Sequence, residues 1–133
     1  MKLNLEFEGR KTYNVTPEDA RDLGYPEEVI ATAVSEVRVS DVKSECRRRI
    51  YAAASAETQM NMATAAAVIS AKEASARTED EALILTGLDD AIGWVASMRG
   101  RVSALADDAA LDIADDANWP PLPDGARDVV DKF

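Results

Sequence analysis

Few side chains in this sequence could carry out bond chemistry. Cys46 is the one cysteine and the chain has no histidine, so a thiolate there would lack the imidazole base that activates most catalytic cysteines. Cys46 also shares a helical face with Val42 and Ile50, which indicates a small buried apolar residue. The absence of histidine excludes Ser-His-Asp catalysis, Cys-His catalysis and histidine metal sites. We therefore expect no enzymatic activity.

Adjacent aspartates are the remaining candidates for a metal site, at Asp89-Asp90, Asp107-Asp108 and Asp115-Asp116. Their spacing does not match the calcium-loop pattern D-x-[DN]-x-[DN]-G, and neighbouring residues on a helix point apart. We interpret these pairs as solvated faces and helix ends. The sequence thus predicts no metal, no cofactor and no small-molecule substrate.

The chain is strongly acidic, with a net charge of -10 and a pI near 4.4. Such a surface repels nucleic-acid phosphates, so we expect no direct binding of DNA or RNA. The acidity could serve solubility, or it could let the protein dock onto a basic partner. Arg47-Arg48-Arg49 is the one basic cluster. Its members fan across about 200° of a helix. We expect them mainly to pair with this protein's own acids; the alternative is a contact with the acidic surface of a partner.

The strongest structural pattern is a seam of apolar residues whose spacing alternates between four and three: Ile84, Leu88, Ala91, Val95, Met98, Val102 and Leu105. This period predicts a helix that packs along another helix. Thr78 and Glu81 form a capping box at its start. Its glycines, Gly87, Gly93 and Gly100, indicate either close helix approach or coincidence.

The partner of this seam is expected in the alanine-rich stretch from Val42 to Ala74. No glycine or proline lies between residues 41 and 75, so one long helix is compatible with the sequence, although its continuity stays open. The two segments predict a long antiparallel helical hairpin spanning residues 39–108. The fold class is mainly α.

Two smaller parts flank the helical hairpin. Residues 1–38 are expected to form a β-hairpin, with a Gly9-Arg10-Lys11 loop and Phe7 opposite Tyr13, followed by two short helices. The first helix begins at the Thr16-Pro17 cap, and the β-prone Val37-Arg38-Val39 is expected to end the second. Residues 109–133 form an acidic, proline-containing, extended tail. No signal peptide or membrane span is expected at the N-terminus.

Candidate interface residues follow from these elements. The apolar face of the β-hairpin is too large to remain exposed to solvent, so it either packs against its own chain or binds a partner. Met60 and Met62 lie about 200° apart on a helix, so one of them should face a second surface. The tail offers two more large apolar side chains. The candidates are Leu3, Leu5, Phe7, Tyr13, Val15, Met62, Trp119 and Leu122.

Several segments resemble small proteins encoded beside tail-fibre genes in phages and prophages. They are the run 45–51 with Ala54-Ser55, the run 59–63, the pattern Gly93-Trp94-x-x-x-Met98-Arg99, and Asn118-Trp119-Pro120. The resemblance covers roughly residues 39–122. It implies a non-enzymatic, tail-associated structural or fibre-assembly protein that acts by protein–protein packing.

The resemblance also implies phage tail or tail-fibre proteins as partners, a possible homo-oligomer, and a location in the virion or the host cytoplasm. It assigns no catalytic residue. The alternative prediction is an acidic inhibitor that occupies the basic nucleic-acid-binding groove of a host protein.

Overall fold

The computed structural model describes residues 1–133 and is mainly α-helical, with one small β-hairpin. In chain order the elements are β1 (Leu3–Phe7), β2 (Arg10–Val15), α1 (Pro17–Asp22), α2 (Glu27–Ala53), α3 (Ala56–Ser70), the 3₁₀ turn η1 (Ala74–Ala76), α4 (Glu79–Asp107), the 3₁₀ turn η2 (Asp116–Asn118) and α5 (Asp124–Val130).

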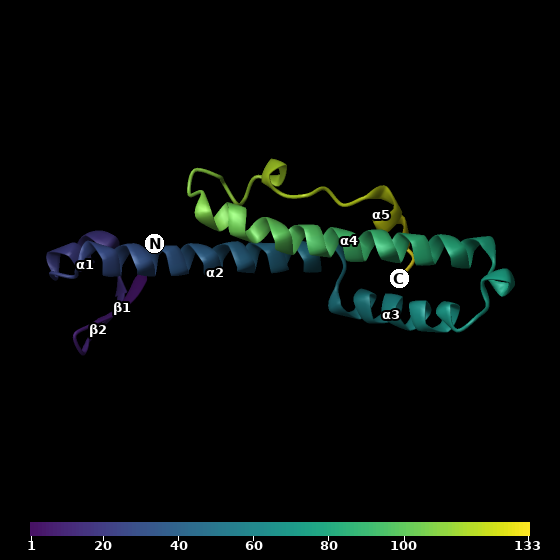
Figure 1. The fold of residues 1–133 in the computed structure, drawn as a ribbon, viewed down its shortest axis with the longest axis horizontal. Coiled ribbons are helices and arrows are strands. Elements are labelled where there is room, and N and C mark those ends of the chain that lie inside the picture. Colours follow the sequence, from purple (N-terminus) through teal and green to yellow (C-terminus); the bar gives the residue numbers. More distant parts are fainter.

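The molecule is elongated (Figure 1). From its N-terminus, the helix α4 runs back along α3 and then along the C-terminal half of α2, so these three helices form an antiparallel helical hairpin. The β-hairpin and α1 lie at the free N-terminal end of α2, and the tail returns along α4. These arrangements confirm the predicted mainly α fold.

The predicted break at Val37–Val39 is wrong, because α2 is continuous from Glu27 to Ala53. Val37 packs against the apolar cluster at the N-terminal end, and the guanidinium of Arg38 donates to the carbonyl oxygens of Leu105 in the last turn of α4 and of Leu111 beyond it. Packing of this kind outweighs the weak helix propensity of valine. The domain boundary expected at residue 38 therefore lies inside a helix.

The chain instead breaks at Ala54, which is extended with φ −146° and ψ 115°. Ser55 then caps α3, and its hydroxyl oxygen accepts a hydrogen bond of 3.1 Å from the backbone N–H of Thr58. A serine followed by an acidic first turn is a helix start signal even without glycine or proline. Residues 41–75 thus form two helices, and Figure 1 shows α3 displaced to one side of α2.

The β-hairpin has a two-residue turn, not the predicted loop of three. Glu8 and Gly9 both have positive φ, 49° and 79°, and Phe7 lies opposite Arg10. Positive φ at both central positions favours a primed turn, whose twist matches that of the strands.

A bulge at Asn14, with φ 60°, then shifts the register so that Leu3 opposes Val15. The predicted pairing of Phe7 with Tyr13 is therefore wrong. Thr12 lies opposite Leu5, so the adjacent Tyr13 points to the other face of the hairpin and is 66% exposed.

The apolar core is divided into three clusters along the length of the molecule. The first joins the β-hairpin, α1 and the start of α2; its buried members are Leu3, Leu5, Ala20, Tyr25, Ile30 and Ala33. The second joins α2, α4 and the tail, with Val42, Cys46, Trp94, Met98, Leu105 and Trp119. The third joins α3, α4 and α5 through Met62, Leu88 and Val129. All seven residues of the predicted seam lie in or against the second and third clusters.

The tail packs along α4 and ends in the short helix α5. A Cβ built on Gly87 would lie 2.6 Å from the carbonyl oxygen of Gly125, so α5 approaches α4 as closely as a glycine allows. Gly93 and Gly100 have no neighbouring atom within 4 Å of such a Cβ. Close approach therefore explains Gly87 and not the other two glycines.

Candidate protein-binding groove

A groove runs between α2, α3 and α4. It consists of two adjoining pockets with volumes of about 460 and 420 Å³. Both pockets are lined by Ile50, Gln59, Val95 and Arg99, so they share a boundary. The groove exists because the break at Ala54 displaces α3 and prevents it from continuing the packing of α2 on α4.

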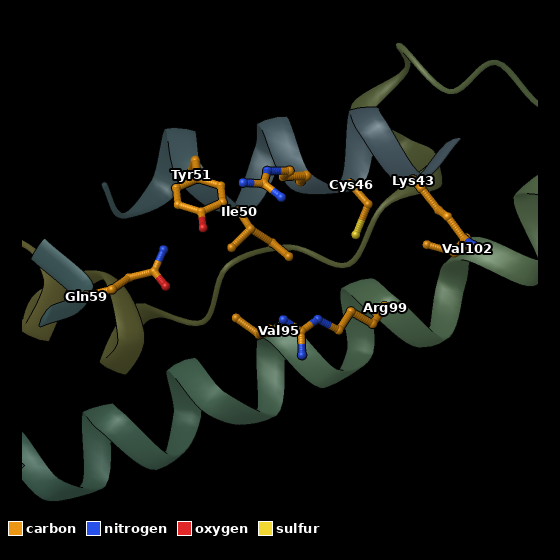
Figure 2. A pocket seen from close by; sticks show the side chains of 9 residues that line it. Lys43, Cys46, Ile50, Tyr51, Gln59, Val95, Arg99 and Val102 are labelled. Carbon is orange, nitrogen blue, oxygen red and sulfur yellow. The ribbon is translucent and has the colours of Figure 1, made fainter. Parts of the chain in front are cut away.

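The first pocket lies between the C-terminal half of α2 and the middle of α4 (Figure 2). Cys46 and Ile50 project from α2 toward α4, where Val95 and Val102 face them. Cys46 is buried, and burial raises the pKa of its thiol. The side chain therefore acts as a small apolar group in the wall of this pocket.

The second pocket is almost entirely apolar. Of the 16 residues that line this pocket, 14 are hydrophobic. The pocket therefore suits an apolar side chain rather than a polar metabolite. Met62 and Leu88 are buried parts of its lining, whereas Ile92 lines it and is 69% exposed. The amide of Gln59 donates a hydrogen bond of 2.8 Å to the carbonyl oxygen of Ala54 and so braces the break beside it.

The charged residues of the groove are all basic. Lys43, Arg47 and Arg99 line it and no carboxylate does, although the chain carries 25 acidic and 15 basic residues. None of the three forms a salt bridge within the chain. Arg47 lies over the ring of Tyr51, 5.2 Å from its centroid. The groove is thus a basic, apolar surface on an acidic protein.

In the cluster Arg47-Arg48-Arg49, two arginines pair with acidic residues of this protein and the third lines the groove. Arg48 and Arg49 both donate to the carboxylate of Glu45, at 2.7 and 2.8 Å, and Arg49 also reaches Asp116 in the tail at 2.7 Å. Hydrogen bonds from Arg48 are the main reason why the pKa of Glu45 is lowered. The predicted pairing with the protein's own acids is confirmed for Arg48 and Arg49, but Arg47 has no acidic partner.

The candidate interface residues of the N-terminal hairpin lie mostly inside the protein. Leu3 and Leu5 are buried against α1 and α2, and Phe7 and Val15 are half-buried against the same cluster. Their apolar face covers this chain's own helix α2 rather than offering an open surface. Tyr13 is exposed, but it stands apart from that face.

The other three candidates, Met62, Trp119 and Leu122, belong to the helical hairpin and the tail. Trp119 is buried in the second cluster, which removes it from the surface. Met62 and Leu122 both line the second pocket. Met62 is the methionine that faces the core, while Met60 is 71% exposed.

Analysis of the sequence alone did not identify Ile92 or Arg99 as residues of a binding surface. Ile92 lies one position beyond Ala91 of the seam, where an apolar residue widens the stripe past what one neighbouring helix can cover. An apolar residue at position 92 was therefore a signal from which the sequence could have indicated an uncovered apolar surface.

The structure contains no cluster of three or more histidine, cysteine, aspartate or glutamate side chains arranged to hold a metal ion. No helix has both the length and the hydropathy that crossing a membrane requires. Comparisons with protein-family models and with curated proteins find no match to this chain. The functional interpretation therefore depends on the groove and on the sequence resemblance.

Proposed function

We propose that this chain is a non-enzymatic, phage tail-associated protein that binds a segment of a tail or tail-fibre protein in the groove between α2, α3 and α4. The observation that carries the proposal is the apolar second pocket, with 14 hydrophobic residues among 16. Apolar surface left open between helices is typical of a site for another polypeptide.

The sequence resemblance supports the same location. Its segments belong to α2, α3, α4 and the tail, and the fold brings them together around the groove. Ile50, Met62, Trp94 and Arg99 lie within these segments and line the pockets. The segment at Pro120 holds the tail against Trp94 by a hydrogen bond of 2.9 Å.

Binding would proceed by burial of apolar side chains, with no covalent step. Each large apolar side chain that a partner transfers from water into the groove contributes about 1.5–3 kcal/mol before the costs of association. Such a protein could remain in the virion as a component, or it could shield an apolar segment of a fibre until assembly is complete.

The alternative, an acidic inhibitor of a nucleic-acid-binding protein, receives less support from the groove. An inhibitor of that kind would present carboxylates to its target, whereas the groove is lined by three basic residues and no acidic one.

A matched pair of variants tests the proposal. Ile92→Asp places a charge in the groove, and Val68→Asp makes the same change at an exposed position of α3 outside it; the two residues are 69% and 59% exposed. Both variants should stay folded. We expect tagged wild-type protein and Val68→Asp to capture a tail or fibre protein, identified by mass spectrometry, from cells that carry the surrounding phage genes. Ile92→Asp should lose it.

Two results would contradict the proposal. If wild-type protein captures no tail or fibre protein and is also absent from purified virions and assembly intermediates, the tail-associated function is wrong. If Ile92→Asp captures the same protein as efficiently as Val68→Asp, the function can stand but the groove is not its site.

A further inference from the structure

We propose that the occupant of the groove is an acidic amphipathic helix of the partner protein, whose carboxylates contact Lys43, Arg47 and Arg99. This inference rests on the proposed function and adds the chemical class of the partner. It follows from the walls of the groove and from the distribution of charge along it.

The walls of the groove favour a helix over an extended strand. A strand binds by completing the hydrogen bonds of a sheet edge, but the single sheet consists of β1 and β2 and lies at the other end of α2. The groove is bordered by α2, α3 and α4, whose backbone hydrogen bonds are made within each helix. A helix needs no further backbone partners and can present one apolar stripe to such walls.

The charge of the groove changes along its length. Of the two pockets that form the groove, Lys43 and Arg47 line the one between α2 and α4, and Arg99 lines both. The pocket bordered by α3 and the tail has no other charged residue. A complementary helix therefore carries its apolar residues toward α3 and its carboxylates toward the C-terminal half of α2.

The three basic residues are free to make these contacts. The chain has an excess of ten negative charges, yet none of the three is neutralised by a carboxylate of its own chain. A guanidinium can bind a carboxylate through two parallel N–H donors, which adds orientation as well as attraction. An acidic helix bound in the groove would supply the carboxylates with which these three basic residues form no salt bridge inside their own chain.

Charge-swapped peptides provide the test. The probes are two fluorescent helical peptides with the same apolar face, one with glutamate and the other with lysine at the flanking positions. In anisotropy titrations with the full chain, the glutamate peptide should bind about tenfold tighter than the lysine peptide. Salt dependence would not discriminate, because salt also screens the repulsion between an acidic peptide and this acidic protein.

The variant Arg47→Glu/Arg99→Glu should reverse that preference. Its control is Arg127→Glu/Lys132→Glu, which changes the net charge equally at two exposed residues that do not line the groove. The control should keep the preference for the glutamate peptide. Circular dichroism of both variants would establish that each is folded.

Four outcomes would overturn the inference. Equal affinity of wild-type protein for the two peptides, or equal loss of preference in the variant and its control, would show that the groove does not select an acidic helix. Failure of both peptides to bind, while capture of a tail protein still depends on Ile92, would reject a helical occupant but leave the proposed function intact. A dimer, seen by light scattering, that excludes the peptide would identify a second copy as the occupant.

Discussion

The indole Nε1 of Trp94 donates a hydrogen bond of 2.9 Å to the carbonyl oxygen of Pro120. The tail is extended here, and its adjoining prolines at 120 and 121 have no N–H, so backbone pairing cannot organise it. A second indole, that of Trp119, donates to the carbonyl oxygen of Ile113 at 2.8 Å. Side chains, rather than secondary structure, therefore hold this part of the chain in place.

Replacing Trp94 with phenylalanine should loosen the tail. Trp94→Phe keeps an aromatic ring but removes the donor to Pro120, whose carbonyl oxygen is then left without this partner. We expect a loss of about 1–2 kcal/mol in the free energy of unfolding, measured by urea denaturation. Tyr13→Phe is the control, because Tyr13 is 66% exposed and its loss of a hydroxyl should change stability by less than about 0.5 kcal/mol. Equal effects of the two changes would contradict this role of Trp94.

Two glycines of α4 should respond to alanine in opposite directions. A Cβ at Gly87 would lie 2.6 Å from the carbonyl oxygen of Gly125 and 3.0 Å from Cβ of Val129, so Gly87→Ala must displace α5. Crowding of this kind typically costs about 1–3 kcal/mol. Gly93 has open space at the same position, and Gly93→Ala should stabilise the helix by up to about 1 kcal/mol.

Chemical denaturation of both glycine variants would measure the difference, and hydrogen exchange would locate it. Protection of the amides of α5 should fall in Gly87→Ala and stay unchanged in Gly93→Ala. A stable Gly87→Ala protein with a protected α5 would show that the two helices can separate without loss.

The end of α4 depends on Arg38, a residue of another helix. The Arg38 guanidinium donates to the carbonyl oxygens of Leu105, at 2.9 Å, and of Leu111, at 2.7 Å. The last turn of α4 has no basic residue of its own, so this guanidinium supplies the positive charge that a helix C-terminus favours.

Substituting lysine for Arg38 should weaken this end. Arg38→Lys keeps the positive charge but cannot reach several carbonyl oxygens with a planar fork of donors, and we expect a loss of about 1–3 kcal/mol. Amides near residues 105–113 should exchange faster than in wild-type protein. Arg47→Lys, at an arginine without a salt bridge, is the control and should leave their exchange unchanged. Unaltered exchange in Arg38→Lys would show that charge alone suffices.

The parts of the fold that local signals determine were predictable from the sequence. The predicted cap at Thr16 and the predicted capping box at Thr78 are both present in the structure, because each depends on residues within one turn. The alternating seam of α4 is likewise packed as predicted. The start of α3 also has a local signal in the cap at Ser55, but the continuity of α2 through Val37 does not follow from local signals. Val37 stays helical because of the tertiary packing around it, whereas Ala54 does not, and propensity alone does not rank them.

The groove was predictable only in part. Met62 and Leu122 were among the candidate residues and line it: helical spacing identified Met62, and Leu122 stood out as a large apolar residue of the tail. Which arginines stay without a carboxylate partner could not be predicted, since an arginine is free or paired according to contacts with residues distant in sequence. Arg49 forms a salt bridge with Asp116, which lies 67 residues further along the chain, whereas Arg47 forms no salt bridge.

The pairing of Glu45 makes stability depend on pH. Hydrogen bonds from Arg48 and then Arg49 hold the pKa of Glu45 below its ordinary value of 4.5. A carboxylate whose pKa is lower in the folded than in the unfolded state contributes stability above the unfolded value and loses that contribution as pH falls through the folded one. Stability from this pair should therefore be constant near neutral pH and decline below pH 4.5.

The variant Glu45→Gln should isolate what the ionised Glu45 carboxylate contributes to the free energy of unfolding. The variant should be less stable than wild-type protein at neutral pH, and the difference should shrink as pH falls below 4.5 and Glu45 itself becomes protonated. Urea denaturation across the acidic range measures it. Glu36→Gln is the control, because Glu36 is exposed and forms no salt bridge, whereas Glu45 is bound to two arginines. A difference between Glu45→Gln and wild-type protein that stays the same at every pH would mean that glutamine perturbs packing rather than removing a charge.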